Sequence, residues 1–251
     1  MMMNQPLSII EILRYAAEAH PGGEIVSVRT EGDMHRETYG EALARAAQLA
    51  HGLAGIGVGH GDRVATLAWN GYRHFELYYA ISGMGAICHT INPRLSAEQM
   101  LYIIKHAGDT VLCLDTTFVP IIEALADHLP KTLTLVLMTD RAHMPESAVE
   151  FLCYEDLLDG QPTTYDWPDL PEDTAAALCY TSGTTGNPKG ALYTHRSTVL
   201  HAMFLGLTIP RSLREGARIL PVVPMFHVNS WGLPYAAPLV GASLIMPGGK
   251  L

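Results

Sequence analysis

The chain has 251 residues, of which 48% are apolar and 16% are charged, with 16 Lys and Arg against 25 Asp and Glu. This apolar content is sufficient for a folded core and excludes a disordered chain. The formal net charge of −9, without a cluster of Lys and Arg, argues against binding of nucleic acid through a basic surface.

Capping boxes predict the first helices. In a capping box, a hydroxyl residue and a Glu or Gln three positions later satisfy the free N–H groups at a helix start. The boxes and the helices that they predict are Ser8 with 9–19, Thr38 with 39–55, and Ser96 with 97–107. Gly57 is placed to end the second helix. Asn70 is a further candidate cap, for a helix over the segment YRHFELYYAI.

Short apolar runs between these helices predict strands, because each run is bounded by Gly, Pro, Asn or Asp. They cover residues 24–29, 63–68, 86–91, 110–115, 132–138, 175–180, 218–223 and 242–246. Strands of this length that alternate with helices favour an α/β fold with layered, largely parallel sheets. The polar, proline-rich segment 159–173 predicts a connection between a first α/β subdomain, 1–158, and a second part, 174–251.

The cysteines and the apolar stretches indicate in which cellular compartment we expect the protein. The four cysteines are Cys88, Cys113, Cys153 and Cys179. They include no C-x-x-C pair and no histidine at zinc-ligand spacing, so we expect buried, reduced thiols in a cytoplasmic protein. The first residues lack the pattern of a signal peptide. Prolines interrupt the charge-free stretch 219–249, which excludes a transmembrane segment there.

The segment 181–190, which reads TSGTTGNPKG, directly follows the predicted strand 175–180. Its glycines allow close backbone approach, its hydroxyl and N–H groups can donate to phosphate oxygens, and Lys189 adds a positive charge. The same composition is typical of an ordinary surface loop. The spacing is not that of a Walker A loop, since Asn187 and Pro188 separate Gly186 from the lysine. The residue types suit a polyphosphate.

The order of residues from Tyr180 to Gly190 closely resembles the phosphate-binding signature of adenylate-forming enzymes. This superfamily comprises acyl-CoA synthetases, peptide-synthetase adenylation domains and luciferases. A second block, LPVVPMFHVNSWGLPY over 220–235, resembles the next motif of the superfamily in the form typical of fatty-acid CoA ligases. The segments GDRVA (61–65) and INPRL (91–95) are also similar to the family. The resemblance implies that residues 1–251 form part of the large N-terminal domain of the adenylate-forming fold.

The resemblance implies an ATP-dependent acid–thiol ligase. A carboxylate would attack the α-phosphorus of MgATP to give acyl-AMP and pyrophosphate, and the thiol of coenzyme A would then displace AMP. The implied nucleotide-binding residues are Thr181, Ser182, Gly183, Thr184, Thr185, Gly186 and Lys189, with Thr184 also contributing to the Mg²⁺ site. His227 and Trp231 are the implied acyl-site residues, and four-residue spacing on a helix would place them on one face. Core packing of Trp231 and a purely structural His227 stay open, and no catalytic residue is assigned.

The family pattern is incomplete in this chain. The C-terminal domain with its catalytic lysine has no counterpart here, so we expect the chain alone to be inactive. The parent enzyme would be a ligase for medium- or long-chain fatty acids, with a homodimer as one option for its assembly. Alternatives are a non-catalytic nucleotide- and acyl-binding remnant, or a ligase for a short thioether acid such as 3-methylmercaptopropionate. We interpret Asp115 and Asp140 as strand ends, and the 195–197 segment as the start of a helix, without catalytic roles.

Overall fold

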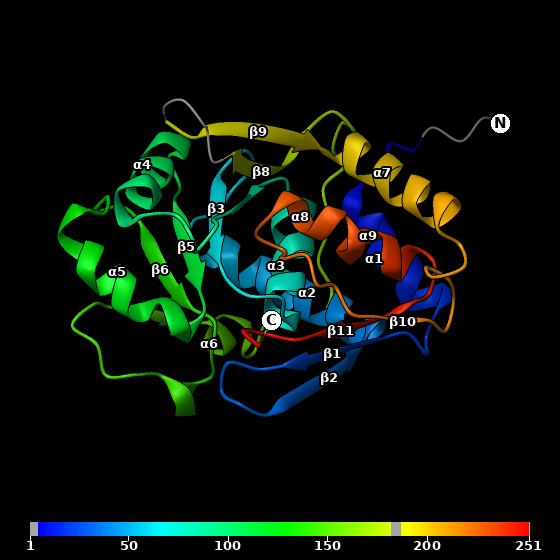
Figure 1. Ribbon diagram of the computed structural model, residues 1–251, viewed down its shortest axis with the longest axis horizontal. Coiled ribbons are helices and arrows are strands. Elements are labelled where there is room, and N and C mark those ends of the chain that lie inside the picture. The colour runs from blue at the N-terminus through cyan, green and yellow to red at the C-terminus, as the bar shows by residue number, and fades with distance from the viewer. Residues whose placement is uncertain (1–4, 182–186, 251) are drawn as a thin grey trace.

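The computed structural model of the chain describes residues 5–181 and 187–250. The strands of its large sheet are β3 (Arg63–Leu67), β4 (Ile87–Thr90), β5 (Val111–Leu114), β6 (Thr134–Leu137), β7 (Leu152–Cys153), β8 (Ala175–Thr181) and β9 (Lys189–Thr194). Those of its small sheet are β1 (Glu24–Val28), β2 (Met34–Thr38), β10 (Arg218–Ile219) and β11 (Ser243–Met246). The strand orders are β7-β6-β5-β3-β4-β8-β9 and β10-β11-β1-β2 (Figure 1).

Neighbouring strands in the described sheets are parallel, except in the antiparallel pairs β1–β2 and β8–β9. The helices are α1 (Ile9–Ala19), α2 (Tyr39–Gly55), α3 (Tyr72–Gly83), α4 (Ala97–Ala107), α5 (Val119–Leu125), α6 (Tyr154–Leu158), α7 (His195–Thr208), α8 (Val228–Trp231) and α9 (Leu233–Leu239). Short 3-10 turns cover Thr116–Phe118, Ala126–His128 and Arg141–His143. The predicted α/β fold with parallel and mixed sheets is confirmed.

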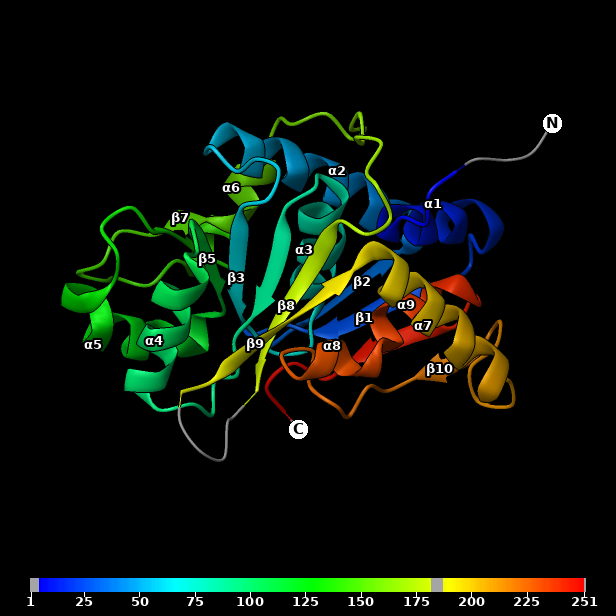
Figure 2. The same ribbon diagram turned by 90° about the horizontal axis from the view of Figure 1, so that it is seen from above.

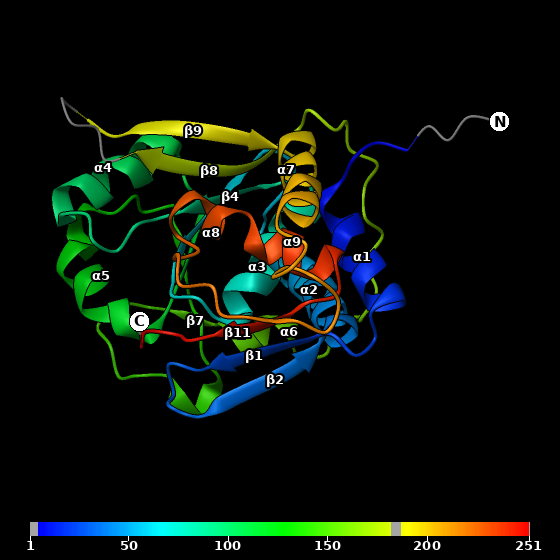
Figure 3. The ribbon, with the colours of Figure 1, turned by 45° about the vertical axis from the view of Figure 1, so that its right-hand side comes forward.

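Helix α3 lies between the two sheets (Figure 3), and all of its 12 residues are buried. It contacts β4 and β8 of the large sheet and β1 of the small sheet. On the opposite face of the large sheet lie α4 and α5 (Figure 2). Val64 and Ala65, neighbours in β3, accordingly belong to different apolar clusters, as the two-residue period of a strand requires. Burial on both faces explains why these strands read as continuous apolar runs.

The helices predicted from capping boxes begin and end as predicted, but one box does not form. Thr38 and Ser96 each make both hydrogen bonds of the box. Ser8 makes no capping hydrogen bond with its side chain. Instead, the first helical N–H, of Ile9, donates to His195 Nδ1 at 3.1 Å. A side chain far away in the sequence thus satisfies one free N–H group at the helix start, while the Glu11 N–H donates to the Ser8 carbonyl oxygen at 3.2 Å.

The strand predicted over 218–223 is much shorter than expected, ending at Ile219. Pro221 and Pro224 have no N–H group to donate to a neighbouring strand, so the chain leaves the sheet. The sequence analysis did not identify β2, β7 or β9. Each sheet contains strands from both sides of segment 159–173, and the proposed division into subdomains stays a prediction.

The cysteines are buried and unpaired, as predicted. Burial raises the pKa of the Cys88 and Cys113 thiols, which makes them poor nucleophiles. Within the described ranges, no helix has the length and apolar character needed to cross a membrane.

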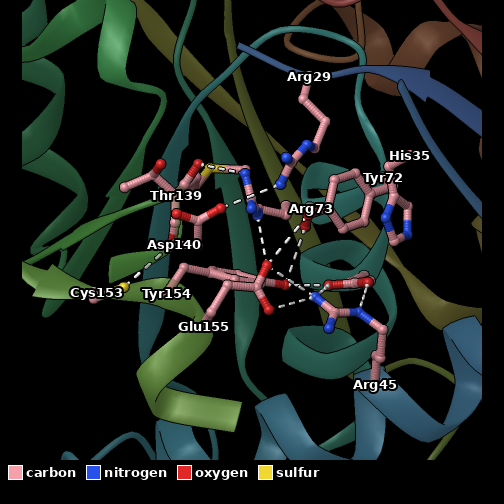
Figure 4. Close-up of polar contacts among 12 residues, drawn as sticks. Arg29, His35, Arg45, Tyr72, Arg73, Thr139, Asp140, Cys153, Tyr154 and Glu155 are labelled. Carbon is pink, nitrogen blue, oxygen red and sulfur yellow. Dashed lines mark hydrogen bonds and ion pairs between the residues drawn. The ribbon is translucent and has the colours of Figure 1, made fainter. Parts of the chain in front are cut away.

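A network of buried ion pairs joins the β1–β2 hairpin to α2, α3 and α6 (Figure 4). Arg73 at the start of α3 contacts Glu31 at 2.7 Å and Glu155 at 2.8 Å. Arg45 from α2 contacts Glu76 at 2.5 Å and Glu155 at 3.0 Å. Burial raises the pKa of Glu31, but the charge and hydrogen bond of Arg73 outweigh it and hold that pKa below its ordinary value. The network therefore contains ionised carboxylates.

Candidate functional site

The described ends of the segment TSGTTGNPKG belong to the paired strands β8 and β9. Thr181 ends β8, Lys189 begins β9, and the two residues are partners in the ladder. The Thr181 hydroxyl donates to the Lys189 carbonyl oxygen at 3.4 Å, and both residues are exposed. Five of the residues predicted to contact phosphate lie outside the described residues: Ser182, Gly183, Thr184, Thr185 and Gly186. Thr184 is also the predicted Mg²⁺ contact. Their roles stay predictions.

The hairpin distinguishes this loop from a P-loop. A Walker A loop leads from a strand into a helix, whereas this one leads into the antiparallel strand β9. Helix α7 begins only at His195, where Thr194 forms a capping box with Ser197. The supporting role predicted for segment 195–197 is consistent with this position. The topology adds to the lysine spacing as an argument against a P-loop hydrolase.

Trp231 ends a left-handed turn that begins directly after His227, so the expectation that the two share the face of an α-helix is wrong. Residues 228–231 have φ values of 48°, 49°, 52° and 53°. This conformation costs roughly 1–2 kcal/mol for each residue that has a Cβ. Sequence spacing could not predict it, because no residue of the turn is a glycine.

Tertiary hydrogen bonds hold this turn in place. The Ser230 hydroxyl donates to the Val223 carbonyl oxygen at 2.7 Å. Asn229 Oδ1 accepts from the Tyr78 hydroxyl and from the Cys179 thiol, each at 3.4 Å. Strained backbone of this kind persists only where surrounding contacts fix it, and such places concentrate at functional sites.

The cavity beside this turn has a volume of about 540 Å³, within the range of small-molecule sites. Its walls include both predicted acyl-site residues, and its lining consists of Trp69, Asn70, Arg94, Val222, Val223, Pro224, His227, Trp231 and Gly248. Trp69, Arg94 and Gly248 follow the carboxyl ends of β3, β4 and β11 respectively. Ligands of open α/β sheets bind at such strand ends. We call this space the strand-end cavity.

Asn70 fixes one wall of the strand-end cavity and does not cap α3, contrary to the sequence prediction. The N-cap position belongs to Gly71. The Asn70 side chain instead donates to the carbonyl oxygens of Pro221 (2.8 Å) and Val223 (3.1 Å) and accepts from the Met225 N–H at 2.6 Å. Since prolines deprive segment 221–225 of a regular ladder, this amide supplies the hydrogen bonds that the segment needs.

Cys179 connects the loop hairpin to the left-handed turn beside the strand-end cavity. Cys179 precedes Thr181 by two residues in β8. The contact of its sulfur with Asn229 joins β8 to the turn that follows His227. Thr90, at the end of β4, contacts the same sulfur at 3.2 Å. The structure thus joins β8, which leads into the loop motif, to the second motif through residues that lie 50 positions apart in the sequence.

The two discounted carboxylates have structural partners. Asp140 accepts the N–H groups of Ala142 and His143 and so caps a 3-10 turn. Asp115 is buried and accepts the Trp69 N–H at 2.7 Å. Burial raises the pKa of Asp115 to about 7, although the hydrogen bond from Trp69 opposes this shift. Neither side chain lines the strand-end cavity.

One group of potential metal ligands occurs among the described residues: Glu31, Asp140 and His143. Arg29 lies 3.3 Å from Asp140 and 3.9 Å from Glu31, and His143 lies 2.6 Å from Asp140. Since side chains of the protein already compensate these carboxylates, we assign no metal to them.

Arg94, Trp69, Asn70 and Gly248 are cavity residues that sequence reasoning did not assign to a site. Arg94 lies in the INPRL segment, which was noticed only for its resemblance to the family. Trp69 directly follows a predicted strand. This position at the carboxyl end of a parallel strand was the one sequence feature that could have indicated a role in a ligand site.

Comparisons with known proteins agree with this fold. The family model described as "AMP-binding enzyme" matches residues 13–251. The chain belongs to this family of AMP-binding enzymes. Its fold is similar to that of the anthranilate CoA ligase AuaEII crystallised with anthranoyl-AMP, with a TM-score of 0.87 and 25% identity over 98% of this chain and 46% of that chain.

Curated relatives cover the whole chain. A medium-chain-fatty-acid–CoA ligase of Ectopseudomonas oleovorans is 49% identical over 100% of this chain and 46% of its own length. A 3-methylmercaptopropionyl-CoA ligase of Ruegeria lacuscaerulensis is 47% identical over 100% of this chain and 47% of its own length. The chain thus spans about half the length of these relatives.

Proposed function

We propose that this chain supplies the ATP-phosphate loop and part of the acyl site of an AMP-forming fatty-acid CoA ligase. The proposed reaction forms acyl-AMP and pyrophosphate from a medium- or long-chain fatty acid and MgATP, and then forms the CoA thioester with release of AMP. The observation that carries the proposal is the hydrogen-bonded connection from β8, which leads into the loop, through Cys179 to the turn beside the strand-end cavity. A cytoplasmic location and Mg²⁺ dependence belong to the same proposal.

In this proposal the protein accelerates the first step by positioning and by charge. The attacking carboxylate and the triphosphate are both negatively charged, so the chain must bring them together and offset that charge. Lys189 is exposed at the mouth of the hairpin, where its ammonium group can reach a phosphate oxygen. The apolar walls of the strand-end cavity, including Val222 and Trp231, suit a hydrocarbon chain.

Lys189→Ala is expected to weaken binding of MgATP at least about tenfold, because hydrogen bonds to charged groups contribute roughly 1.5–3 kcal/mol. Calorimetric titration of the chain with MgATP measures the change. Lys131→Ala, which removes another exposed lysine, is the matched control and should bind as the unaltered chain does. Equal affinity in the Lys189 and Lys131 variants would contradict the proposal, and so would the absence of MgATP binding by the unaltered chain.

Trp231→Ala is expected to shift the preference of the full-length enzyme toward longer acids. The indole is 63% exposed in the wall of the strand-end cavity, so its removal opens space for further methylene groups, each worth about 0.8 kcal/mol when buried. The measurement is kcat/KM for a series of linear acids and for 3-methylmercaptopropionate, the thioether acid of the second candidate function. Leu207→Ala, on exposed α7 surface away from this cavity, is the control. An unchanged profile would exclude Trp231 from chain-length selection.

A further inference from the structure

The phenol of Tyr180 joins the strand that leads into the loop 181–190 to helix α4. Tyr180 directly precedes Thr181 at the end of β8, and its hydroxyl lies 2.6 Å from Nδ1 of His106 in α4. Burial raises the pKa of Tyr180 to about 12, so the hydroxyl keeps its proton near neutral pH and donates to Nδ1 of the neutral imidazole. The His106 ring is itself held, because it stacks on that of Tyr102, one helical turn earlier, at 5.3 Å.

The ring of Tyr180 also packs against both strands that neighbour β8. On β4, the His89 ring lies 5.1 Å from it, and the buried Asp109 orients His89, since both of its carboxylate oxygens lie 2.9 Å from Nδ1. On β9, Gly190 is the direct partner of Tyr180, and a Cβ at Gly190 would lie 3.3 Å from the phenol ring. The glycine therefore leaves room for the ring across β9, at the residue that follows Lys189.

The position of β9 explains why the hairpin needs this support. It is the outermost strand of the large sheet, and no strand of the described ranges pairs with its outer side. A strand that is paired on one side only opens more readily at its end than a central strand. A loop that must be ordered when its ligand binds loses affinity by the cost of that ordering. Contacts from Tyr180 to α4, β4 and β9 reduce this cost.

We propose that Tyr180 is a positioning residue for the loop 181–190. Anchored to α4 by His106, it holds the paired strand ends Thr181 and Lys189 in the conformation that receives the triphosphate. The inference rests on the proposed function for the identity of the ligand. It assigns to Tyr180 and His106 no contact with the nucleotide and no part in the chemistry, because both act through the backbone of the hairpin.

Tyr180→Phe and His106→Ala each remove the hydrogen bond, and each is expected to weaken binding of MgATP to the chain about threefold. Calorimetric titration measures this at a temperature where every variant is folded, so a loss of overall stability alone leaves the affinity unchanged. The double variant should bind as the single variants do, because the two changes remove the same bond. His106→Asn, whose amide oxygen can accept from the Tyr180 hydroxyl, should restore the affinity. Tyr102→Phe is the matched control, since it removes a phenolic hydroxyl from the same aromatic group and keeps the bond.

Hydrogen exchange of residues 178–192, measured without nucleotide, tests the positioning independently of MgATP. Tyr180→Phe and His106→Ala are expected to exchange faster there than Tyr102→Phe. Exchange and affinity equal to those of Tyr102→Phe would overturn the inference, as would a loss of affinity without faster exchange or faster exchange without a loss of affinity. An unaltered chain that binds no MgATP contradicts the proposed function, and the exchange comparison then still decides whether Tyr180 holds the hairpin.

Discussion

Arg73→Met is expected to lower the free energy of unfolding by about 3–5 kcal/mol, the usual cost of removing one partner from a buried ion pair. Arg73 is 4% exposed and contacts Glu31, Glu155 and the Met138 carbonyl oxygen, at 2.7 Å, 2.8 Å and 2.9 Å. A methionine fills most of the space but leaves the Glu31 and Glu155 carboxylates without that charge. A loss of this size is a large fraction of the total stability of a typical domain, about 5–15 kcal/mol.

Chemical denaturation of the chain near neutral pH measures this change. Arg36→Met is the matched control, because it removes the same side chain from an exposed pair with Glu24 at 2.6 Å, and exposed pairs contribute about 0–1 kcal/mol. Arg73→Lys, which keeps the charge but cannot contact both carboxylates as a fork, should fall between the two. If Arg73→Met unfolds at the same denaturant concentration as Arg36→Met, the network contributes little to stability.

This network illustrates what the sequence could not predict. Its members come from β1–β2, α2, α3 and α6, and Glu31 and Glu155 lie more than 100 residues apart. Local patterns identified β1, α2 and α3, but neither β2 nor α6, and gave no sign of the pairing between these side chains. The surrounding helices were predicted accurately for the opposite reason. The ends of α2 and α4 depend on capping contacts within four residues of the cap, so the local sequence contains what is needed.

The errors have the same origin. Ser8 and Asn70 have typical cap side chains, but neither caps: the Glu11 N–H donates to the Ser8 carbonyl oxygen and the Ile9 N–H to His195, while Asn70 binds segment 221–225. Similarly, the left-handed turn before Gly232 depends on Val223, Tyr78 and Cys179. Glycine is required at 232, where φ is 77° and a Cβ would meet the His201 ring at 2.6 Å. The motif letters predicted that His227 and Trp231 belong to one site, but not the backbone geometry that places them there.

Asp115→Asn is expected to stabilise the chain increasingly as pH rises from about 4 to about 8. Burial raises the pKa of Asp115 in the folded chain to about 7 from an ordinary value of 3.8. Below the ordinary value the carboxyl is protonated in both states and costs nothing. Between the two values the unfolded chain releases the proton and the folded chain retains it, so the stability of the unaltered protein falls; above about pH 7 the penalty is complete. Its upper limit is on the order of 4 kcal/mol.

The asparagine removes this penalty and keeps the local hydrogen bond, since its amide oxygen can accept the Trp69 N–H as the carboxylate does. The measurement is the difference in free energy of unfolding between Asp115→Asn and the unaltered chain at several pH values. Asp127→Asn, on an exposed carboxylate, controls for the change in net charge. A difference that stays constant with pH would show that Asp115 is ionised in the folded chain, with the Trp69 N–H and Arg73 together compensating its burial. A difference that rises with pH would show that Asp115 changes its protonation near neutral pH in the folded chain. Because the Asp115 carboxyl group accepts the Trp69 N–H, the backbone beside the strand-end cavity would then depend on a group that titrates in this range.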